Sequence, residues 1–208
     1  MSLFITFEGG EGSGKSFQAK ELYRKLSQLA IPALLTHEPG GTPFGKKLGR
    51  WLKWSQGTDI SPLTELMLFN ASRAQLVAEV IKPGLESGKV VISDRYADST
   101  TAYQGYGRGL DLDTVKLTNN AATQGLKPDL TILLDIPAEE GLDRKGAKSR
   151  DRFEREALAF HHRVRKGYLK MAEDEPERWL VVDASQSKRE IAQIIWQRVS
   201  QLLATRGG

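Results

Sequence analysis

Residues 9–16 restrict the fold of this chain more than any other stretch. They read Gly-Gly-Glu-Gly-Ser-Gly-Lys-Ser and fit the pattern G-x-x-x-x-G-K-[ST] without a mismatch. Glycines in such a loop permit positive φ angles and let consecutive backbone N–H groups point inward at an anion. Lys15 adds a positive charge, and the hydroxyl of Ser16 is suited to magnesium. The segment is therefore predicted to bind phosphate, with positive φ angles at Gly9, Gly12 and Gly14.

A strand before this loop and a helix after it are the context that such a loop requires. Residues 3–7 form an apolar run typical of a buried strand. After the loop, apolar side chains recur at helical spacing, at Phe17, Ala19, Leu22, Leu26 and Leu29. Because both flanks fit, a flexible glycine turn with a chance lysine is the weaker interpretation.

Length and composition indicate one globular domain, which we assign to residues 1–208. Of the 208 residues, 39% are hydrophobic and 27% are charged, and the net charge of +4 is too small to argue for nucleic acid. The absence of cysteine excludes disulfides, thiolate metal sites and a cysteine nucleophile. No apolar run approaches membrane-spanning length. We expect a cytoplasmic protein with neither a membrane nor a nucleic-acid partner.

Apolar strand-like runs alternate with helical patterns along the chain, at residues 33–36, 89–93, 130–134 and 179–182. This alternation predicts an α/β fold, with a parallel five-stranded sheet flanked by helices. Ligand sites in such folds gather at the carboxyl ends of the strands. The polar residues expected at that edge are those of the loop, Glu38-Pro39, Asp94-Arg95 and Asp183.

A helix is predicted to begin at Ser61-Pro62. Its expected core stripe consists of Leu63, Met67, Asn70, Ala74, Val77 and Ile81. Phe69 and Arg73 lie four residues apart, hence on one face, about a quarter turn from that stripe. An aromatic plane beside a guanidinium suits a flat heterocycle. On periodicity alone, a peripheral phenylalanine and a solvated arginine is the favoured interpretation.

Asp94 and Arg95 follow an almost wholly apolar strand. A carboxylate at this position can orient magnesium, and the planar fork of an arginine can bind a second phosphate. The alternative is an ion pair at the end of the strand. Farther on, the glycines Gly105, Gly107 and Gly109 predict a mobile turn.

Residues 144–152 carry five positive charges. A solvated basic loop is the usual meaning of such a run. In a chain that binds phosphates, the run also suits a lid that closes over them.

Four motifs in order give this chain a resemblance to the bacterial thymidylate kinases, over nearly its whole length. They are Phe7-Glu8-Gly9 leading into the phosphate loop, Glu38-Pro39-Gly40-Gly41-Thr42, the Phe69 and Arg73 pair, and Asp94-Arg95-Tyr96 with Ser99, Ala102, Tyr103, Gln104 and Gly105. The resemblance implies the phosphorylation of dTMP by ATP with magnesium, and a homodimer.

The resemblance also implies roles for individual residues. ATP would be bound by Gly9, Gly10, Glu11, Gly12, Ser13, Gly14, Lys15 and Ser16, and magnesium by Ser16 and Asp94. The dTMP site would comprise Glu11, Glu38, Pro39, Phe69, Arg73, Arg95, Ser99, Thr100, Tyr103 and Gln104. Phe69 would stack on thymine, Arg73 and Gln104 would hydrogen-bond its edge, and Tyr103 would crowd the position of a ribose 2′-OH.

The catalytic residues are expected to be Lys15, Arg95, Arg144, Arg150 and Arg152. The family divides by whether its catalytic arginine lies in the phosphate loop or in the lid, and Glu11-Gly12-Ser13 contains none. The chain therefore resembles the lid-arginine type. It departs from the family pattern at His37, usually arginine, and at Lys145 and Lys148 in a shorter lid.

The residues support phosphoryl transfer independently of the family resemblance. Phosphoryl transfer is catalysed mainly by positioning and charge neutralisation, and a phosphate acceptor is already anionic, so it needs no general base. Two alternatives stay open at this point. One is a P-loop kinase with a different nucleotide or small-molecule acceptor, and the other is a nucleotide-hydrolysing switch without an acceptor.

Overall fold

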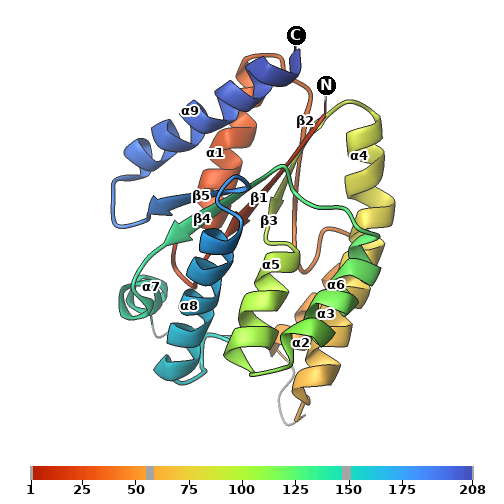
Figure 1. The fold of residues 1–208 in the computed structure, drawn as a ribbon, viewed down its shortest axis with the longest axis vertical. Helices are drawn as coiled ribbons and strands as arrows, with labels where there is room; N and C mark the ends of the chain where they lie inside the picture. Colours follow the sequence, from red (N-terminus) through yellow and green to blue (C-terminus); the bar gives the residue numbers. More distant parts are fainter. Residues whose placement is uncertain (1, 55–58, 147–150, 208) are drawn as a thin grey trace.

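The computed structural model describes residues 2–54, 59–146 and 151–207. Its centre is a sheet of five parallel strands, in the order β2-β3-β1-β4-β5 (Figure 1). The strands are β1 Leu3–Glu8, β2 Ala33–His37, β3 Val90–Asp94, β4 Leu130–Asp135 and β5 Trp179–Asp183. The α/β fold with a five-stranded parallel sheet is confirmed.

Two helices, α1 Lys15–Gln28 and α9 Lys188–Gly207, cover one face of the sheet (Figure 1). Their apolar side chains form one core cluster with Ile5 and Phe7 of the central strand. Leu22 and Leu26 from α1 and Ile195 from α9 belong to it. Burial of this face fixes α1 against the sheet, and with it the loop from which α1 starts.

The remaining helices lie on the other face or at its edge. They are α2 Pro43–Trp54, α3 Pro62–Leu76, η1 Val77–Ile81, α4 Lys82–Glu86, α5 Ala97–Thr100, η2 Thr101–Gly107, α6 Leu112–Thr123, α7 Ala138–Lys145 and α8 Leu158–Asp174. In the part of the chain that the structure describes, no helix combines the length and the apolar character needed to cross a bilayer.

The predicted core stripe of α3 is wrong at its first two positions. Leu63 and Met67 are 47% and 49% exposed. The helix instead buries a partly polar face, which includes Glu65, Asn70 and Arg73, toward α6 and η2. Polar groups from distant segments satisfy one another there, and apolar periodicity does not detect such pairing.

The mobile turn predicted around the glycines is wrong for Gly105 and Gly107, because residues 101–107 are helical, and a turn follows only at residues 108–109. A Cβ on Gly105 would lie 2.7 Å from Leu112, and one on Gly107 would lie 2.6 Å from Phe160. Both glycines therefore permit close packing of η2 against α6 and α8.

Candidate active site

A cavity of about 330 Å³ opens at the carboxyl ends of the strands. It brings together most of the predicted site, namely Glu11, Gly12, Gly14, Lys15, Ser16, Glu38, Pro39, Phe69, Arg73, Asp94, Arg95, Ser99, Thr100, Tyr103, Gln104 and Arg144. The phosphate loop lies at one end of this cavity, which we call the phosphate end. Phe69, Arg73 and Gln104 lie at the other, which we call the base end.

The phosphate loop connects β1 to α1 and has the backbone that its glycines predict. The φ angles are +139° at Gly9, +68° at Gly12 and +91° at Gly14. A Cβ on Gly9 would lie 2.5 Å from the carbonyl oxygen of Leu134, and one on Gly12 would lie 1.9 Å from that of Gly141. Glycine is therefore required at both positions by conformation and by space.

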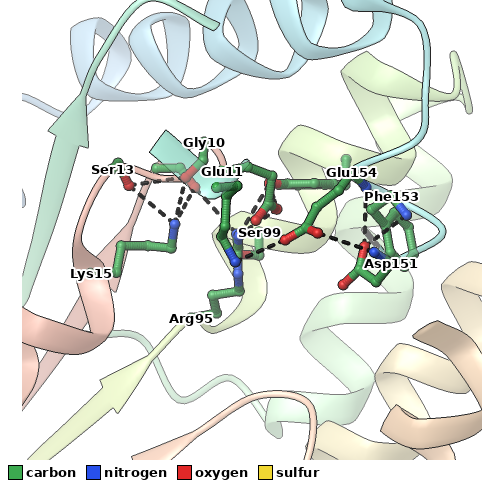
Figure 2. A network of polar contacts seen from close by, with 12 residues as sticks. Gly10, Glu11, Ser13, Lys15, Arg95, Ser99, Asp151, Phe153 and Glu154 are labelled. Carbon is green, nitrogen blue, oxygen red and sulfur yellow. Dashed lines mark hydrogen bonds and ion pairs between the residues drawn. The ribbon is translucent and has the colours of Figure 1, made fainter. Parts of the chain in front are cut away.

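Lys15 turns back onto its own loop (Figure 2). Its Nζ donates to Gly9 O at 3.0 Å, Gly10 O at 2.6 Å and Ser13 Oγ at 3.1 Å. Burial, together with the nearby charge of Arg95, lowers the pKa of Lys15 to about 8. These neutral acceptors hold the ammonium at the phosphate end, and a bound phosphate offers it a stronger partner.

Arg95 adopts φ +74°, a left-handed conformation that is costly for a residue with a side chain. The backbone is held there because Arg95 N donates to Phe7 O at 3.0 Å. The guanidinium then lies beside Glu11 (Figure 2), with Nη2 2.9 Å from Oε1. It also lies over the ring of Tyr103, 5.0 Å from the ring centroid. Such strain in a cavity is typical of a functional position.

Glu11 at the tip of the loop is an ionised carboxylate. Burial alone would raise its pKa, but Arg95, Lys15 and the Tyr103 hydroxyl together lower the pKa to about 2. Both Arg95 and Tyr103 bind the same oxygen, Oε1, with the tyrosine hydroxyl at 2.7 Å. None of the residues that the structure describes donates a hydrogen bond to Oε2.

Arg73 is 1% exposed, so the interpretation of it as a solvated side chain is wrong. Its Nε donates to Glu38 Oε2 at 2.9 Å, and its Nη2 donates to Glu38 at 2.6 Å and to Tyr96 O at 3.1 Å. Its Nη1 donates to Asn70 Oδ1 and Asn119 Oδ1, both at 3.1 Å. Every N–H group of the guanidinium therefore has an acceptor.

Aromatic rings form a wall at the base end. The Phe69 ring centroid lies 5.6 Å from that of Phe153, and the Tyr103 centroid lies 6.0 Å from Phe153. Ser99 and Thr100 also line the cavity. Ser99 is bound to Glu8 and to the hydroxyl of Tyr168, whose Oη lies 2.9 Å from Ser99 Oγ.

Ser16 and Asp94 come together at the phosphate end. Ser16 Oγ donates a hydrogen bond to Asp94 Oδ2, although 78 residues separate them. Both supply hard oxygen ligands of the kind that magnesium prefers. No cluster of three acidic, histidine or cysteine side chains occurs among residues 2–54, 59–146 and 151–207. Two protein ligands suit magnesium, which takes the rest of its shell from water and substrate phosphates.

The three predicted lid arginines are placed differently. Arg144, in the last turn of α7, lines the cavity and donates from Nη1 to Ala184 O at 2.9 Å. Arg150 lies outside the described residues. Arg152 does not line the cavity: its Nε donates to Leu52 O at 3.0 Å, and its Nη2 binds Glu65. The structure therefore places Arg152 apart from the other predicted phosphate ligands, with its donors directed at α2 and α3. Its predicted action on the phosphates stays a prediction.

The end of the lid and the residues after it supply cavity residues that the sequence analysis missed. Asp151, Phe153 and Glu154 (Figure 2) line the cavity. Lys145 lines it as well. Lys145 Nζ lies 2.8 Å from Glu154 Oε1. Asp151 Oδ1 accepts from the backbone N–H groups of Phe153 and Glu154, both at 3.0 Å. The alternation of acidic, basic and aromatic residues in this segment was the available signal.

The fold and the site define a P-loop nucleotide kinase, with the loop after the first strand of a parallel sheet and aromatic side chains lining the same cavity. A family model described as thymidylate kinase matches residues 7–195. A thymidylate kinase from Dehalococcoides mccartyi (strain CBDB1) is 59% identical over 99% of each chain. One from Roseiflexus sp. (strain RS-1) is 49% identical over 99% of this chain and 96% of its own.

Solved structures agree with the sequence relatives. The crystal structure of thymidylate kinase from Ehrlichia chaffeensis superposes with a TM-score of 0.77 at 34% identity, and the match covers 95% of this chain and 98% of that one. The chain belongs to the thymidylate kinase family.

Proposed function

We propose that this protein transfers the terminal phosphoryl group of ATP to the phosphate of dTMP, which gives dTDP and ADP. One observation carries the proposal: a single cavity joins the phosphate loop to a pocket with an aromatic wall and a fixed arginine. The acceptor is already an anion, so catalysis requires alignment and charge neutralisation. Neutralisation is what the cations at the phosphate end supply.

At the phosphate end, the loop N–H groups and Lys15 hold the ATP phosphates. Ser16 and Asp94 would hold magnesium, which neutralises charge on the phosphates when bound. Arg95 exchanges part of its contact with Glu11 for the dTMP phosphate. Arg144 and Arg150 act on the transferring group from the lid, whereas Arg152 holds the segment after the lid in place.

At the base end, Phe69 stacks on thymine, and Gln104 and Arg73 hydrogen-bond its edge. Because each N–H of Arg73 already has an acceptor, the base shares a hydrogen that now goes to Asn70 or Asn119. Tyr103 stands where a ribose 2′-OH would lie. Pro39, Ser99 and Thr100 complete the wall, and Glu38 acts by fixing Arg73.

We also propose that two copies associate. Apolar side chains of the adjacent helices α2, α3 and α6 are exposed, with Phe44 at 47%, Trp51 at 42%, Leu63 at 47%, Met67 at 49% and Leu117 at 72%. Such a patch is typical of an interface. Sedimentation of the Leu63→Glu and Met67→Glu variants should show monomers in place of dimers. A cytoplasmic location, which a cysteine-free chain permits, belongs to the same proposal.

The decisive experiment uses purified protein, ATP and magnesium with each nucleoside monophosphate in turn. We expect dTDP to form from dTMP, with little ATP hydrolysis until dTMP is added. Failure to form dTDP would overturn the proposal. Preference for another acceptor would favour a different kinase, and acceptor-independent hydrolysis would favour a nucleotide switch.

A further inference from the structure

Glu65, in the first turn of α3, is a fully buried carboxylate for which the proposed reaction has no use. Three side chains from other segments converge on it. Gln104 Nε2 lies 2.7 Å from Oε1, Arg108 Nε lies 3.2 Å from Oε1, and Arg152 Nη2 binds Oε2. Both carboxylate oxygens of Glu65 therefore accept hydrogen bonds from these side chains.

The contact with Gln104 fixes which end of the amide faces the cavity. The oxygens of Glu65 are the acceptors in these contacts, so the NH₂ of Gln104 faces Glu65. The amide oxygen of Gln104 then points away from Glu65. Gln104 lines the cavity, and no donor among the described residues reaches Oε1 of its amide. Without Glu65, the two ends of the amide are nearly equal in shape and free to exchange places.

The orientation matters because pyrimidines differ at the same edge. Thymine presents an N3–H donor, whereas the unprotonated N3 of cytosine is an acceptor. A site that presents a fixed acceptor pairs with the first and leaves two lone pairs opposed with the second.

We propose that Glu65 is a positioning residue for base selection: it holds Gln104 with its amide oxygen toward the base, so that the pocket accepts thymine and rejects cytosine. The inference rests on the proposed placement of the base beside Gln104. It also gives Arg152 and Arg108 a role, since both contact the carboxylate of Glu65 and hold it in place.

The test compares dTMP with 5-methyl-dCMP, which has nearly the same shape but the opposite donor and acceptor at N3 and at position 4. Formation of dTDP by the wild type tests the proposed function by itself. In Glu65→Gln, residue 65 can present either end of its own amide, so Gln104 can turn. We expect the ratio of kcat/KM for the two substrates to fall by about tenfold or more, mostly through KM.

The matched control is the double variant Glu65→Gln with Gln104→Glu. The amide introduced at position 65 then donates to a carboxylate at position 104, which is an acceptor in either orientation, so the preference for dTMP should return. Gln104→Leu, which has no acceptor, should lack that preference. The test does not depend on the folding of Glu65→Gln alone. If that variant does not fold, the test uses Gln104→Leu and the double variant, which keeps a negative charge beside Arg108. An unchanged substrate ratio in Glu65→Gln or Gln104→Leu, or no recovery in the double variant, would overturn the inference.

Discussion

The two ends of the cavity hold their cations in different ways. At the phosphate end, Lys15 contacts carbonyl oxygens of its own loop, and Arg95 pairs with a carboxylate whose side chain is 13% exposed. At the base end, Arg73 and Glu38 are 1% and 4% exposed and are joined by three hydrogen bonds. The contacts at the phosphate end can be exchanged for contacts with a ligand. Breaking those at the base end would strongly destabilise the fold, because it leaves a buried charge without its partner.

This difference assigns the neutralisation of phosphate charge to one end of the cavity and the selection of the base to the other. Phosphates must enter, react and leave, so their site benefits from cations that have weaker partners to return to. A base is selected by shape and by fixed donors and acceptors, so its site benefits from side chains that do not move. Substitutions at the two ends should therefore fail differently, in activity at the phosphate end and in stability at the base end.

The largest expected effect is from Glu38→Ala at the base end. It leaves the guanidinium of Arg73 buried without its main partner, which should lower the free energy of unfolding by about 3–5 kcal/mol. Urea unfolding followed by circular dichroism measures this loss. The matched variant Glu11→Ala should lose far less stability, because Arg95 keeps its contacts with Ser99 and Tyr103. Equal losses would contradict the comparison.

Lys15→Ala should have the opposite effect to Glu38→Ala, with a large loss of activity and little loss of stability. Loss of the ammonium removes charge stabilisation from the transferring group, so kcat/KM should fall roughly 10²–10³-fold. The thermal midpoint should change little, because the partners of Lys15 are atoms of its own loop, at residues 9, 10 and 13. Wild-type turnover in this variant would mean that the loop does not hold the reacting phosphates.

The phosphate loop could be predicted in detail because its geometry depends on residues adjacent in sequence. The positive φ angles at Gly9, Gly12 and Gly14 follow from a local pattern. The five parallel strands were predictable for a similar reason, since each is a short apolar run. The role proposed for Phe69 and Arg73 required more than a local pattern, because only the other family motifs indicate it.

The remaining features depend on contacts between distant residues. Glu65 was not singled out, because its partners lie 39 and 87 residues away. Arg152 was assigned by its position in a basic run, and charge alone does not tell a phosphate ligand from a partner of a buried carboxylate. The helix at 101–107 contains glycines that suggest a turn until the close approach of Leu112 and Phe160 is known.

Glu11→Ala should have an intermediate effect on activity. Among the described residues, Oε2 of Glu11 has no donor, and a sugar hydroxyl in the cavity is a natural partner for it. We expect a higher KM for dTMP and a lower kcat, with a cost of about 1.5–3 kcal/mol for a charged hydrogen bond and little change in ATP affinity. The control is 3′-deoxy dTMP. Equal losses with dTMP and with this analogue would show that Glu11 does not bind the 3′-OH.

The smallest expected effect is a pH dependence of ligand binding. It should appear in ATP binding at the phosphate end and be absent from dTMP binding. Because the pKa of Lys15 is lowered to about 8 in the free enzyme, its ammonium is present below that pH and is lost above it. ATP affinity should therefore fall between about pH 7.5 and 9, by at most about tenfold per pH unit. Bound phosphates favour the charged form, so kcat should fall less.

Calorimetric titration measures the affinities for ATP and for dTMP over this pH range, and so compares the two ends of the cavity directly. The affinity for dTMP should stay nearly constant, because Arg73 and Arg95 are guanidinium groups that remain protonated throughout. Lys15→Arg should remove the pH dependence of ATP binding, whatever it does to turnover, since its charge does not titrate here. A decline shared by both ligands, or one that persists in Lys15→Arg, would place the titrating group elsewhere and remove the proposed distinction between the two ends.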